Sequence, residues 1–596
     1  MQQKLSLYLA DFLVQQGITA CFTITGGGAM HLNDAFGHQA GMRCLYHHHE
    51  QACAIAAEGY ARHSGKPALT CVTTGPGGTN ALTGVMGSWV DSIPMLVISG
   101  QVKREETISS TPIPLRQLGD QEFNIIDVAR HMTKYAVMIA DPAEIAYHVE
   151  KALYLAQNGR PGPVWLDIPL DVQGAAIDPD TLRHFDPAEI DLQAGGIAEE
   201  TARDILARIA AAKRPVLLAG SAVVQSGARD AFVLLAEKLQ IPVLTAWGAH
   251  DTLWSDHPLF CGKPGTMGTR GGNFVAQNAD LLLSIGCRLN LRMIGHNKHQ
   301  FAKDAYQIVV DIDKAELEKP TLRPNMPIHA DLRQVIARLL PLAYAPSAAH
   351  PQWLAWCRAI DAKYPPAKPE WFLQEAPLNP YVLMDIFFRA LPAGESVVCS
   401  NGTACVTGQQ AAIATKGMRQ IVNSGCASMG YGLPAAIGAS IAAQNKRVFC
   451  LDGDGSFQMN LQELQTVVHH QMNLKILVVN NNGYHSIRQT QRNYFQPPLV
   501  GVSPDSGISF PSLEKLAYAY DIPYLRIDSI SSAKEAMTKM LSMEGPVLCE
   551  AMVDPDQNFE PKISSKVLPD GRIVSTELDD MFPFLPRDEY DANHIV

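Results

Sequence analysis

The sequence has no long apolar run and no excess of basic charge. No segment of its 596 residues approaches the roughly 20 consecutive apolar residues that a membrane-spanning helix needs. Lysine and arginine number 48 against 59 aspartates and glutamates, which gives a net charge of −11, so no basic surface is expected for nucleic acid or an anionic membrane. The first residues lack an apolar signal core. We expect a soluble, cytoplasmic protein that acts on small molecules, with neither nucleic acid nor membrane as a partner.

Two further patterns are missing. The 12 cysteines show no repeated spacing, and most lie in apolar runs, as Cys71, Cys399 and Cys450 do. This distribution favours reduced core thiols over a disulfide framework. No Gly-x-Gly-x-x-Gly fingerprint with a downstream ribose-binding acid is evident, which argues against a Rossmann dehydrogenase.

Short β-rich apolar runs alternate with longer helical patterns, as in parallel sheets built from βαβ units. The clearest runs fall into three groups: 68–73, 95–98 and 164–168; 215–219, 281–285 and 308–312; 396–399, 448–451 and 476–479. We predict an α/β protein with three doubly wound parallel-sheet domains, at residues 1–180, 195–345 and 375–555, of which the second is Rossmann-like.

Three stretches outside these domains have a different character. The segments near 171–200 and 341–380 are predicted to be connectors, the second because its prolines interrupt regular structure. The tail, 556–596, ends in an acidic stretch that contains Phe582 and Phe584. It is either a solvated end or an active-site flap held by these phenylalanines.

The strongest chemical signal is a Gly-Asp-Gly-Ser turn after a strand. Asp454 stands in this turn, and the helical pattern that follows leaves free backbone N–H groups where a phosphate can bind. The next strand ends at Asn481 and Gly483. Because parallel strands end at the same edge of a sheet, a carboxylate, an amide oxygen and a backbone carbonyl converge there. Such oxygens suit Mg²⁺.

A second pattern, three histidines followed by Glu50, lies near the N-terminus. Consecutive strand residues point to alternating faces, so the histidines cannot all ligate one zinc ion. Glu50 stands between an apolar strand and a helical run. Alone it would be an ordinary acid at a helix N-terminus, but a carboxyl group in an apolar setting favours the neutral form that can donate a proton.

Together the two motifs resemble the thiamine diphosphate fingerprint of 2-oxo-acid decarboxylases and acetohydroxyacid synthases, over about residues 1 to 555. The resemblance implies thiamine diphosphate and Mg²⁺ as cofactors. It also implies that 1–180 is a pyrimidine-binding domain, 195–345 a central domain and 375–555 a diphosphate-binding domain. Asp454, Asn481 and the carbonyl of Gly483 would hold the metal, and Glu50 would hydrogen-bond N1′ of the aminopyrimidine. In that family the cofactor lies between the first domain of one subunit and the third of another, which implies at least a homodimer, with a homotetramer expected.

Other segments match the same family. Gly425 to Ala435 resembles the segment that bends the cofactor, so Met429 would wedge between its two rings and the Ala427 carbonyl would contact its 4′-amino group. Gly27 and Gln121 would join Glu50 and Met429 at the reacting centre. The remaining cofactor-binding residues implied by the resemblance are Gly75, Asn80, Gly402, Thr403, Ala404, Gly455 and Ser456.

The acceptor side departs from acetohydroxyacid synthases. Asp120 precedes Gln121 where those enzymes carry a phenylalanine, and Thr490 stands in place of a tryptophan. Arg292, at the position whose arginine meets a second 2-oxo acid, is kept, and Arg488 is a further acceptor candidate. The two replacements predict a roomier and more polar acceptor pocket, unless they are ordinary surface substitutions.

The Arg-Gln-x-Gly-x-Gln-Glu pattern around Gln121 resembles a subgroup that transfers acetyl from pyruvate to the ketone carbon of a nucleotide-linked deoxysugar. We expect decarboxylation of a 2-oxo acid, pyruvate, and transfer of the acyl carbanion to a ketone or ketosugar. An acetolactate synthase and a flavin-dependent pyruvate oxidase are the alternatives. The middle domain, with Gly220, the loop 271–273 and the strand ending at Asp311, resembles the FAD domain of acetohydroxyacid synthases. It binds FAD or is vestigial.

Overall fold

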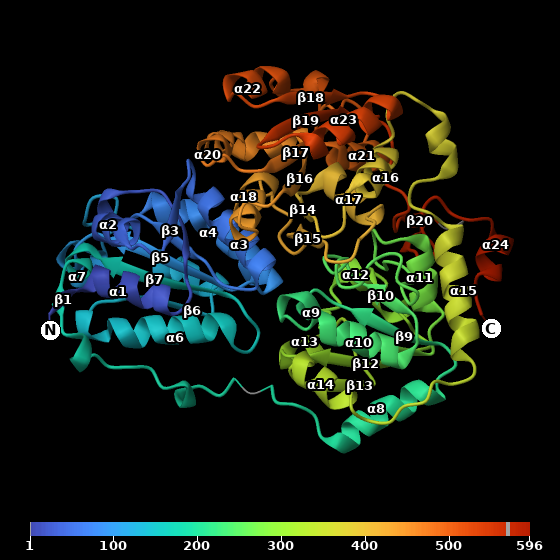
Figure 1. Ribbon diagram of the computed structural model, residues 1–596, viewed down its shortest axis with the longest axis horizontal. Coiled ribbons are helices and arrows are strands. Elements are labelled where there is room, and N and C mark those ends of the chain that lie inside the picture. Colours follow the sequence, from blue (N-terminus) through green and yellow to red (C-terminus); the bar gives the residue numbers. More distant parts are fainter. Residues whose placement is uncertain (1, 193, 568–571, 596) are drawn as a thin grey trace.

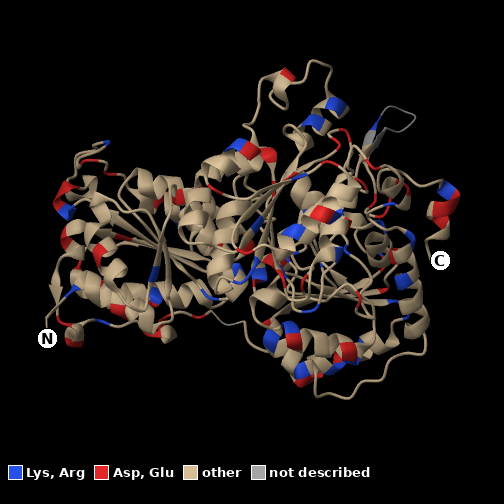
Figure 2. Cartoon of the chain, turned by 45° about the horizontal axis from the view of Figure 1, so that its top comes forward, with Lys and Arg blue, Asp and Glu red and all other residues tan. Residues whose placement is uncertain are grey.

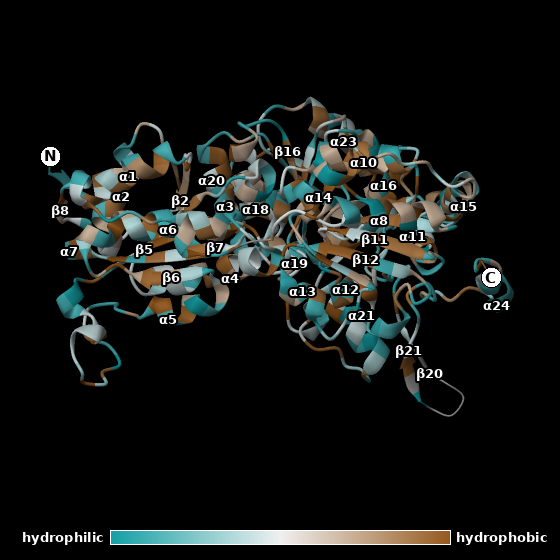
Figure 3. Ribbon diagram, turned by 90° about the horizontal axis from the view of Figure 1, so that it is seen from below, coloured by the Kyte–Doolittle hydropathy of each residue, from teal (hydrophilic) through white to brown (hydrophobic). Residues whose placement is uncertain are grey.

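The computed structural model describes residues 2–192, 194–567 and 572–595. Three parallel sheets, each covered by helices, follow one another along the chain (Figure 1). The α/β class with three parallel-sheet units is confirmed. Each run predicted to be a strand overlaps an observed strand of one of these sheets. Hydrophobic residues are concentrated on the strands and on the helix faces that pack against them (Figure 3). Within the described residues, no helix combines the length and apolar character needed to cross a bilayer.

The first unit contains a six-stranded sheet with strand order β3-β2-β4-β5-β7-β6. All neighbouring strands pair in parallel, so the carboxyl ends of β2, β3, β4 and β5 lie at one edge. The strands are β2 (Ala20–Thr23), β3 (Arg43–Tyr46), β4 (Leu69–Val72), β5 (Met95–Gln101), β6 (Tyr135–Met138) and β7 (Pro163–Pro169). Its main helices are α1 (Leu5–Gln15), α2 (Met30–His38), α3 (Glu50–Ser64), α4 (Pro76–Asp91) and α6 (Ile145–Gln157).

The central unit has a five-stranded parallel sheet in the order β10-β9-β11-β12-β13. Its strands are β9 (Pro215–Ala219), β10 (Val243–Thr245), β11 (Leu281–Ile285), β12 (Tyr306–Asp311) and β13 (Met326–His329). Its helices are α8 (Glu199–Ala211), α9 (Ala222–Gln225), α10 (Arg229–Leu239), α11 (Arg270–Gln277), α12 (Leu291–Ile294), α13 (Lys314–Glu318), α14 (Leu332–Leu339) and α15 (His350–Lys363).

The third unit has a six-stranded parallel sheet in the order β15-β14-β16-β17-β19-β18. Its strands are β14 (Ser396–Cys399), β15 (Arg419–Val422), β16 (Val448–Gly453), β17 (Leu474–Asn480), β18 (Tyr524–Ile527) and β19 (Val547–Met552). Its helices are α16 (Pro380–Ala390), α17 (Gly402–Gln410), α18 (Gly432–Ala442), α19 (Asp454–Phe457), α20 (Leu464–His469), α21 (His485–Tyr494), α22 (Leu513–Ala519) and α23 (Ile530–Ser542). The residue boundaries of the three units remain a prediction.

Helices α3 and α18 join the first and third units at closely packed glycines (Figure 1). A Cβ atom on Gly59 would lie 2.2 Å from the carbonyl oxygen of Ala435, and one on Gly438 would lie 1.8 Å from that of Ala56. Any larger side chain would force the two helices apart. This contact fixes α3, and therefore the glutamate at its first position, relative to the third unit.

One predicted connector needs correction, and of the two alternatives for the tail the structure argues against a solvated end. The proline-rich stretch 341–380 contains helix α15, because Pro351 lies in its first turn, where a missing N–H costs no hydrogen bond. The tail packs against the central unit instead of extending into solvent. Its buried anchors are Leu578 and Met581, whereas Phe584 is exposed. Each of the 12 cysteines is free and most are buried, as expected for core thiols.

Candidate active site

The structure brings the three predicted metal-binding residues together at the carboxyl edge of the third sheet. Asp454 begins α19 directly after β16, and Asn481 and Gly483 follow the adjacent parallel strand β17. The Asp454 carboxylate accepts hydrogen bonds from the backbone N–H groups of Gly483 and Gly455, each at 2.9 Å. Only glycine fits at position 483, because a Cβ there would lie 1.9 Å from the carbonyl oxygen of Val502.

The donor set of this corner fits a hard divalent cation. The Asn481 side chain donates through Nδ2 to Thr403 at 2.9 Å, while its buried Oδ1 has no hydrogen-bond partner in the described part of the chain. Burial raises the pKa of Asp454 to about 6, against the opposing hydrogen bonds from Gly483 and Gly455. Among the described residues, no group of three or more His, Cys, Asp or Glu side chains is arranged to hold a metal ion. One carboxylate with amide and carbonyl oxygens favours Mg²⁺, which completes its shell with phosphate oxygens and water.

A hydroxyl cluster lies beside this corner and supports the predicted phosphate loop. The Ser456 hydroxyl accepts the N–H of Gly430 at 2.9 Å and lies 2.9 Å from the Ser400 hydroxyl. Helix α17 begins at Gly402, whose φ of 58° lies in the left-handed region. Thr403 and Ala404 form its first turn, so backbone N–H groups of α17 and α19 are available near the same corner.

The segment predicted to bend the cofactor is held in a strained conformation. Ala427 has a φ of 52°, which is unfavourable for a residue with a Cβ atom. The Asn423 side chain stabilises it by accepting the N–H groups of Cys426 and Ala427 at 3.1 and 3.2 Å. The Asn401 amide donates to the Ser428 carbonyl at 2.7 Å. Strain maintained in this way is typical of functional sites; Met429 is half-buried in the same segment.

The predicted residues of the first unit gather at the carboxyl edge of its own sheet. Glu50 begins α3, and its Oε2 accepts a hydrogen bond from Asn80 on α4 at 2.9 Å. Gly75 packs so closely on the Gln121 backbone that a Cβ would lie 2.1 Å from its carbonyl oxygen. Gly27 lies in the turn after β2, next to Gly28, whose N–H donates to Thr73. The resemblance named these residues one by one, and the structure brings them to one edge of the first sheet.

Glu463 is a residue of the site that the sequence reasoning missed. It ends the 3-10 helix Gln458–Glu463 of the third unit and is fully buried. Its carboxylate lies 2.8 Å from Nδ1 of His47 and accepts the backbone N–H of His48 at 2.9 Å. Burial alone would raise the pKa of Glu463, but the interactions with His47, Thr466 and the His48 N–H hold it below its usual value. The only signal in the sequence was an acid within an amphipathic helical run.

The side chains of the three consecutive histidines lie in different environments, in agreement with the prediction that they cannot all ligate one zinc ion. His47 is buried against Glu463, His48 is exposed, and the His49 side chain caps α3 by accepting the N–H of Gln51. The backbone on both sides of Glu50 is therefore fixed. Asn460, also in the third unit, adds a 3.0 Å hydrogen bond to the Gln51 side chain.

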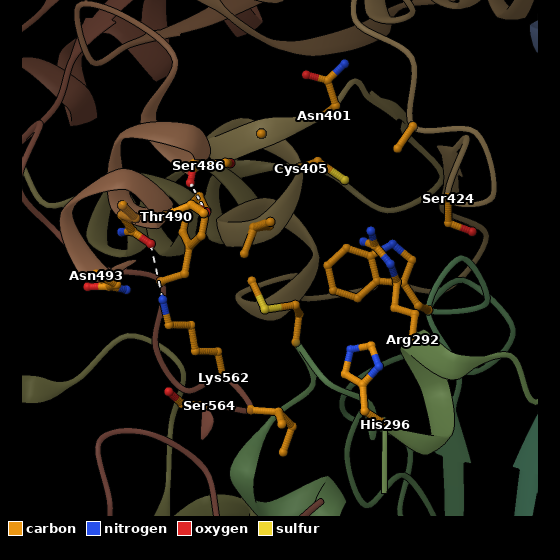
Figure 4. Close-up of a pocket in the computed structure, with 18 of the residues that line it drawn as sticks. Arg292, His296, Asn401, Cys405, Ser424, Ser486, Thr490, Asn493, Lys562 and Ser564 are labelled. Carbon is orange, nitrogen blue, oxygen red and sulfur yellow. Dashed lines mark hydrogen bonds between the residues drawn. The ribbon is translucent and has the colours of Figure 1, made fainter. Parts of the chain in front are cut away.

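A pocket of about 500 Å³ lies next to the corner formed by Asp454, Asn481 and Gly483 (Figure 4). Its lining includes Gly402 and Ala427, predicted to bind the cofactor, and Arg292 and Thr490, predicted to meet the acceptor. Among the described residues, its lining comes from the central unit, the third unit and the tail, and none comes from the first unit. Glu50 therefore does not face the pocket of its own chain.

Three acceptor candidates lie outside this lining. Arg488 is buried at the metal corner, where its guanidinium donates to the Asn481 carbonyl at 2.7 Å. Asp120 and Gln121 are exposed on a loop of the first unit. The buried Glu122 holds that loop by accepting the backbone N–H groups of Ile108, Leu118 and Gly119. Arg488 is thus better placed to support the loop that contains Asn481 and Gly483 than to meet an acceptor.

Comparisons with known proteins agree with this geometry. The chain matches the thiamine pyrophosphate enzyme N-terminal TPP binding domain at residues 3–126, the central domain at 202–339 and the C-terminal TPP binding domain at 400–551. The acetolactate synthase isozyme 1 large subunit of Escherichia coli K12 is 32% identical over 560 residues, covering 93% of this chain and 95% of the relative. The chain belongs to the acetohydroxyacid synthase-like family of thiamine pyrophosphate enzymes.

Two further relatives show the same coverage. The isozyme 2 large subunit of Escherichia coli K12 is 32% identical over 559 residues, with 93% of this chain and 96% of the relative covered. The acetolactate synthase large subunit of Lactococcus lactis is 30% identical over 571 residues, with 94% of both chains covered. The protein is therefore a thiamine-diphosphate-dependent enzyme of the carboligase type.

A second cavity, of about 380 Å³, lies between the central unit and the first unit. It lies where the carboxyl ends of β9, β11 and β12 meet, and the strand order reverses between β9 and β11, which is where such sheets bind nucleotides. Gly220 is needed here, because its Cβ would lie 2.0 Å from the Gly286 carbonyl oxygen. Burial raises the pKa of Asp311, at the end of β12, to about 6. The predicted glycine loop 271–273 is instead the buried first turn of α11, so it does not line this cavity.

Proposed function

We propose that the enzyme decarboxylates a 2-oxo acid, pyruvate, and joins the resulting acyl group to a ketone or ketosugar with formation of a C–C bond. The observation that carries this proposal is the polarity of the pocket on the side of Thr490. Ser486, Gln489, Thr490, Asn493 and Ser564 line it there. Ser486 and Ser564 are half-buried, and Thr490 and Asn493 are exposed at the mouth of the pocket. A hydroxylated acceptor offers these hydroxyl and amide groups hydrogen-bond partners, and a small apolar one does not.

Different residues have separate roles in the proposed reaction. Thiamine diphosphate, when bound, supplies the electron sink for decarboxylation. We propose that Asp454, Asn481 and Gly483 hold the Mg²⁺ that anchors its diphosphate, and that Glu50 holds and moves a proton at N1′ of its aminopyrimidine. Arg292 projects into the pocket from α12, where it binds the carboxylate of the 2-oxo acid.

We further propose that the working enzyme is at least a homodimer. The pocket beside Asp454 lacks any first-unit lining among the described residues, whereas Glu50 and its neighbours gather at a separate edge. Large apolar side chains are exposed in the segments at that edge: Met30, Tyr46, Leu118 and Phe123. Pairing two chains would cover these side chains and complete each pocket with a glutamate from its neighbour.

Acetolactate synthase activity is the second candidate, supported by the names of the relatives and by the retained Arg292. Product analysis separates the two. Holoenzyme given pyruvate and a hydroxylated ketone such as dihydroxyacetone should form the branched adduct in preference to acetolactate. Thr490→Trp, which fills the polar side of the pocket, should lower the adduct-to-acetolactate ratio at least about tenfold, the effect of about 1.4 kcal/mol. Acetolactate as sole product, at a rate that the ketone does not change, would refute the ketone assignment.

We propose FAD as the occupant of the central cavity, in a structural role, since the carboligation involves no net redox change. The freshly purified protein should carry a flavin that denaturation releases and that fluorescence quantifies. A colourless protein that takes up no FAD would refute this. Oxygen consumption with pyruvate, at the rate of carbon dioxide release, would instead favour a flavin-dependent pyruvate oxidase.

A further inference from the structure

The charge of the pocket differs from that of the rest of the molecule. Acidic and basic residues are interspersed over the chain, whose net charge is −11 (Figure 2). Among the described residues that line the pocket, however, the charged side chains are Arg292 and Lys562, with His296 as a third titratable base, and none is an aspartate or glutamate. A carboligase that bound a single anionic group in this pocket would need one cationic side chain to pair with it. The pocket instead contains two, Arg292 and Lys562.

The two cations lie on different sides of the cavity. Figure 4 shows Arg292 beside His296 at one side and Lys562 at the other, below Thr490 and Asn493. Arg292 also lies 5.4 Å from the Trp247 ring centre. A single small carboxylate at Arg292 would leave Lys562 unused.

Lys562 is held in place but lacks a counter-ion. Its backbone pairs with Phe582 through two hydrogen bonds of 3.0 and 2.8 Å, so the tail positions it. Its ammonium group makes only a long contact, 3.4 Å, to the neutral Gln489 side chain. Among the described residues no carboxylate lies within ion-pair distance of it, and the adjacent Glu560 pairs with Lys368 at 3.3 Å. Burial lowers the pKa of Lys562, with Glu560 only partly opposing this. A half-buried cation without a partner is costly unless a ligand compensates it.

The groups around each cation indicate which anion it prefers. The planar guanidinium of Arg292 matches a carboxylate in a bidentate manner, whereas a lysine acts as a point charge that suits phosphate. Hydroxyl and amide groups of Thr490, Asn493 and Ser564 line the pocket on the side of Lys562. The Asn493 amide and the Ser564 hydroxyl can donate to the oxygens of a phosphate, and Thr490, whose hydroxyl donates to the Ser486 carbonyl at 3.1 Å, adds polar surface beside them.

We propose that Lys562, with Thr490, Asn493 and Ser564, forms a second anion-binding subsite that holds a phosphate group of the acceptor. The inference rests on the proposed function, because it assigns the subsite to the acceptor of the carboligation. The phosphate belongs either to a phosphomonoester of a ketose or to the diphosphate of a nucleotide-linked sugar. The tail thereby determines acceptor specificity.

Binding to the holoenzyme tests the subsite directly. Enzyme saturated with thiamine diphosphate and Mg²⁺, so that the cofactor's own phosphate site is filled, is titrated calorimetrically with glycerol 3-phosphate and, separately, with UDP-glucose. At least one probe should bind saturably, and Lys562→Met should weaken it by about 10- to 100-fold, the effect of losing a charge-assisted hydrogen bond. Lys562→Arg should restore part of the affinity. Lys368→Met, which removes a neighbouring lysine that does not line the pocket, should bind like the wild type.

The two probes also distinguish the source of the phosphate, since only the better-binding one represents the natural group. Absence of saturable binding of either probe, or equal binding by Lys562→Met, would overturn the subsite. Carbon dioxide release from pyruvate, measured in the same preparations, reports separately on the proposed function. If pyruvate is not decarboxylated by the wild type while phosphate binding depends on Lys562, the carboligase proposal fails and the phosphate subsite stands without its assignment to an acceptor.

Discussion

Replacing Glu50 by glutamine should lower turnover by about 10²- to 10⁴-fold, the usual contribution of general acid–base catalysis. Glutamine keeps the size of the side chain and an oxygen that can accept the 2.9 Å hydrogen bond from Asn80. It cannot exchange a proton with the aminopyrimidine. The direct measurement is proton–deuterium exchange at C2 of bound thiamine diphosphate, which should slow in parallel with turnover.

The fold should survive this change, because α3 is held from both sides of Glu50 by the contacts of His47 and Gln51 with the third unit. Circular dichroism and thermal unfolding should therefore match the wild type. Glu200→Gln, at an exposed carboxylate on α8, is the matched control and should leave turnover unchanged. C2 exchange at the wild-type rate in Glu50→Gln would disprove the proposed role.

Replacing Asp454 by alanine should weaken magnesium-dependent binding of thiamine diphosphate by about 100-fold or more, since loss of even the outer partners of a metal site costs about 10- to 100-fold. Asp454 is the only carboxylate among the three proposed ligands, and the Asn481 oxygen and Gly483 carbonyl cannot replace its charge. Calorimetric titration with thiamine diphosphate, with magnesium and with a chelator, measures the effect. The difference between the two conditions should be large in the wild type and small in the variant.

Asp454→Asn removes the charge at unchanged side-chain size, but its single oxygen can accept only one of the two N–H groups, because Gly455 donates to Oδ1 and Gly483 to Oδ2 of Asp454. Asp505→Asn, at an exposed aspartate of the same unit, is the control. Wild-type affinity in Asp454→Ala would contradict this metal site.

A mixture of Glu50→Gln and Asp454→Ala chains adds a test of the dimer. If each site combines two chains, mixed dimers regain one intact site, about a quarter of wild-type activity in a random mixture; no recovery would place each site within one chain.

The features that could be predicted from the sequence are those that depend on short, local segments. The parallel sheets followed from apolar runs alternating with helical patterns, and the cluster of Asp454, Asn481 and Gly483 followed from residues that end neighbouring parallel strands. The proline-rich connector was misjudged because one proline position, the first turn of a helix, is compatible with helix formation. The loop 271–273 was misjudged because glycine there serves close packing against Asp361, not a turn.

The sequence by itself thus determined the class of fold, the edge of the sheet where Asp454, Asn481 and Gly483 meet, and the glutamate that starts α3. These depend on short segments whose periodicity and order are visible in one dimension. Only the tertiary structure decided that Glu463 braces the histidines before Glu50, that Lys562 enters the pocket and that the first unit stays outside the pocket of its own chain. Each of these arises where segments distant along the chain pack together, and burial, not any local pattern, selects which side chains meet.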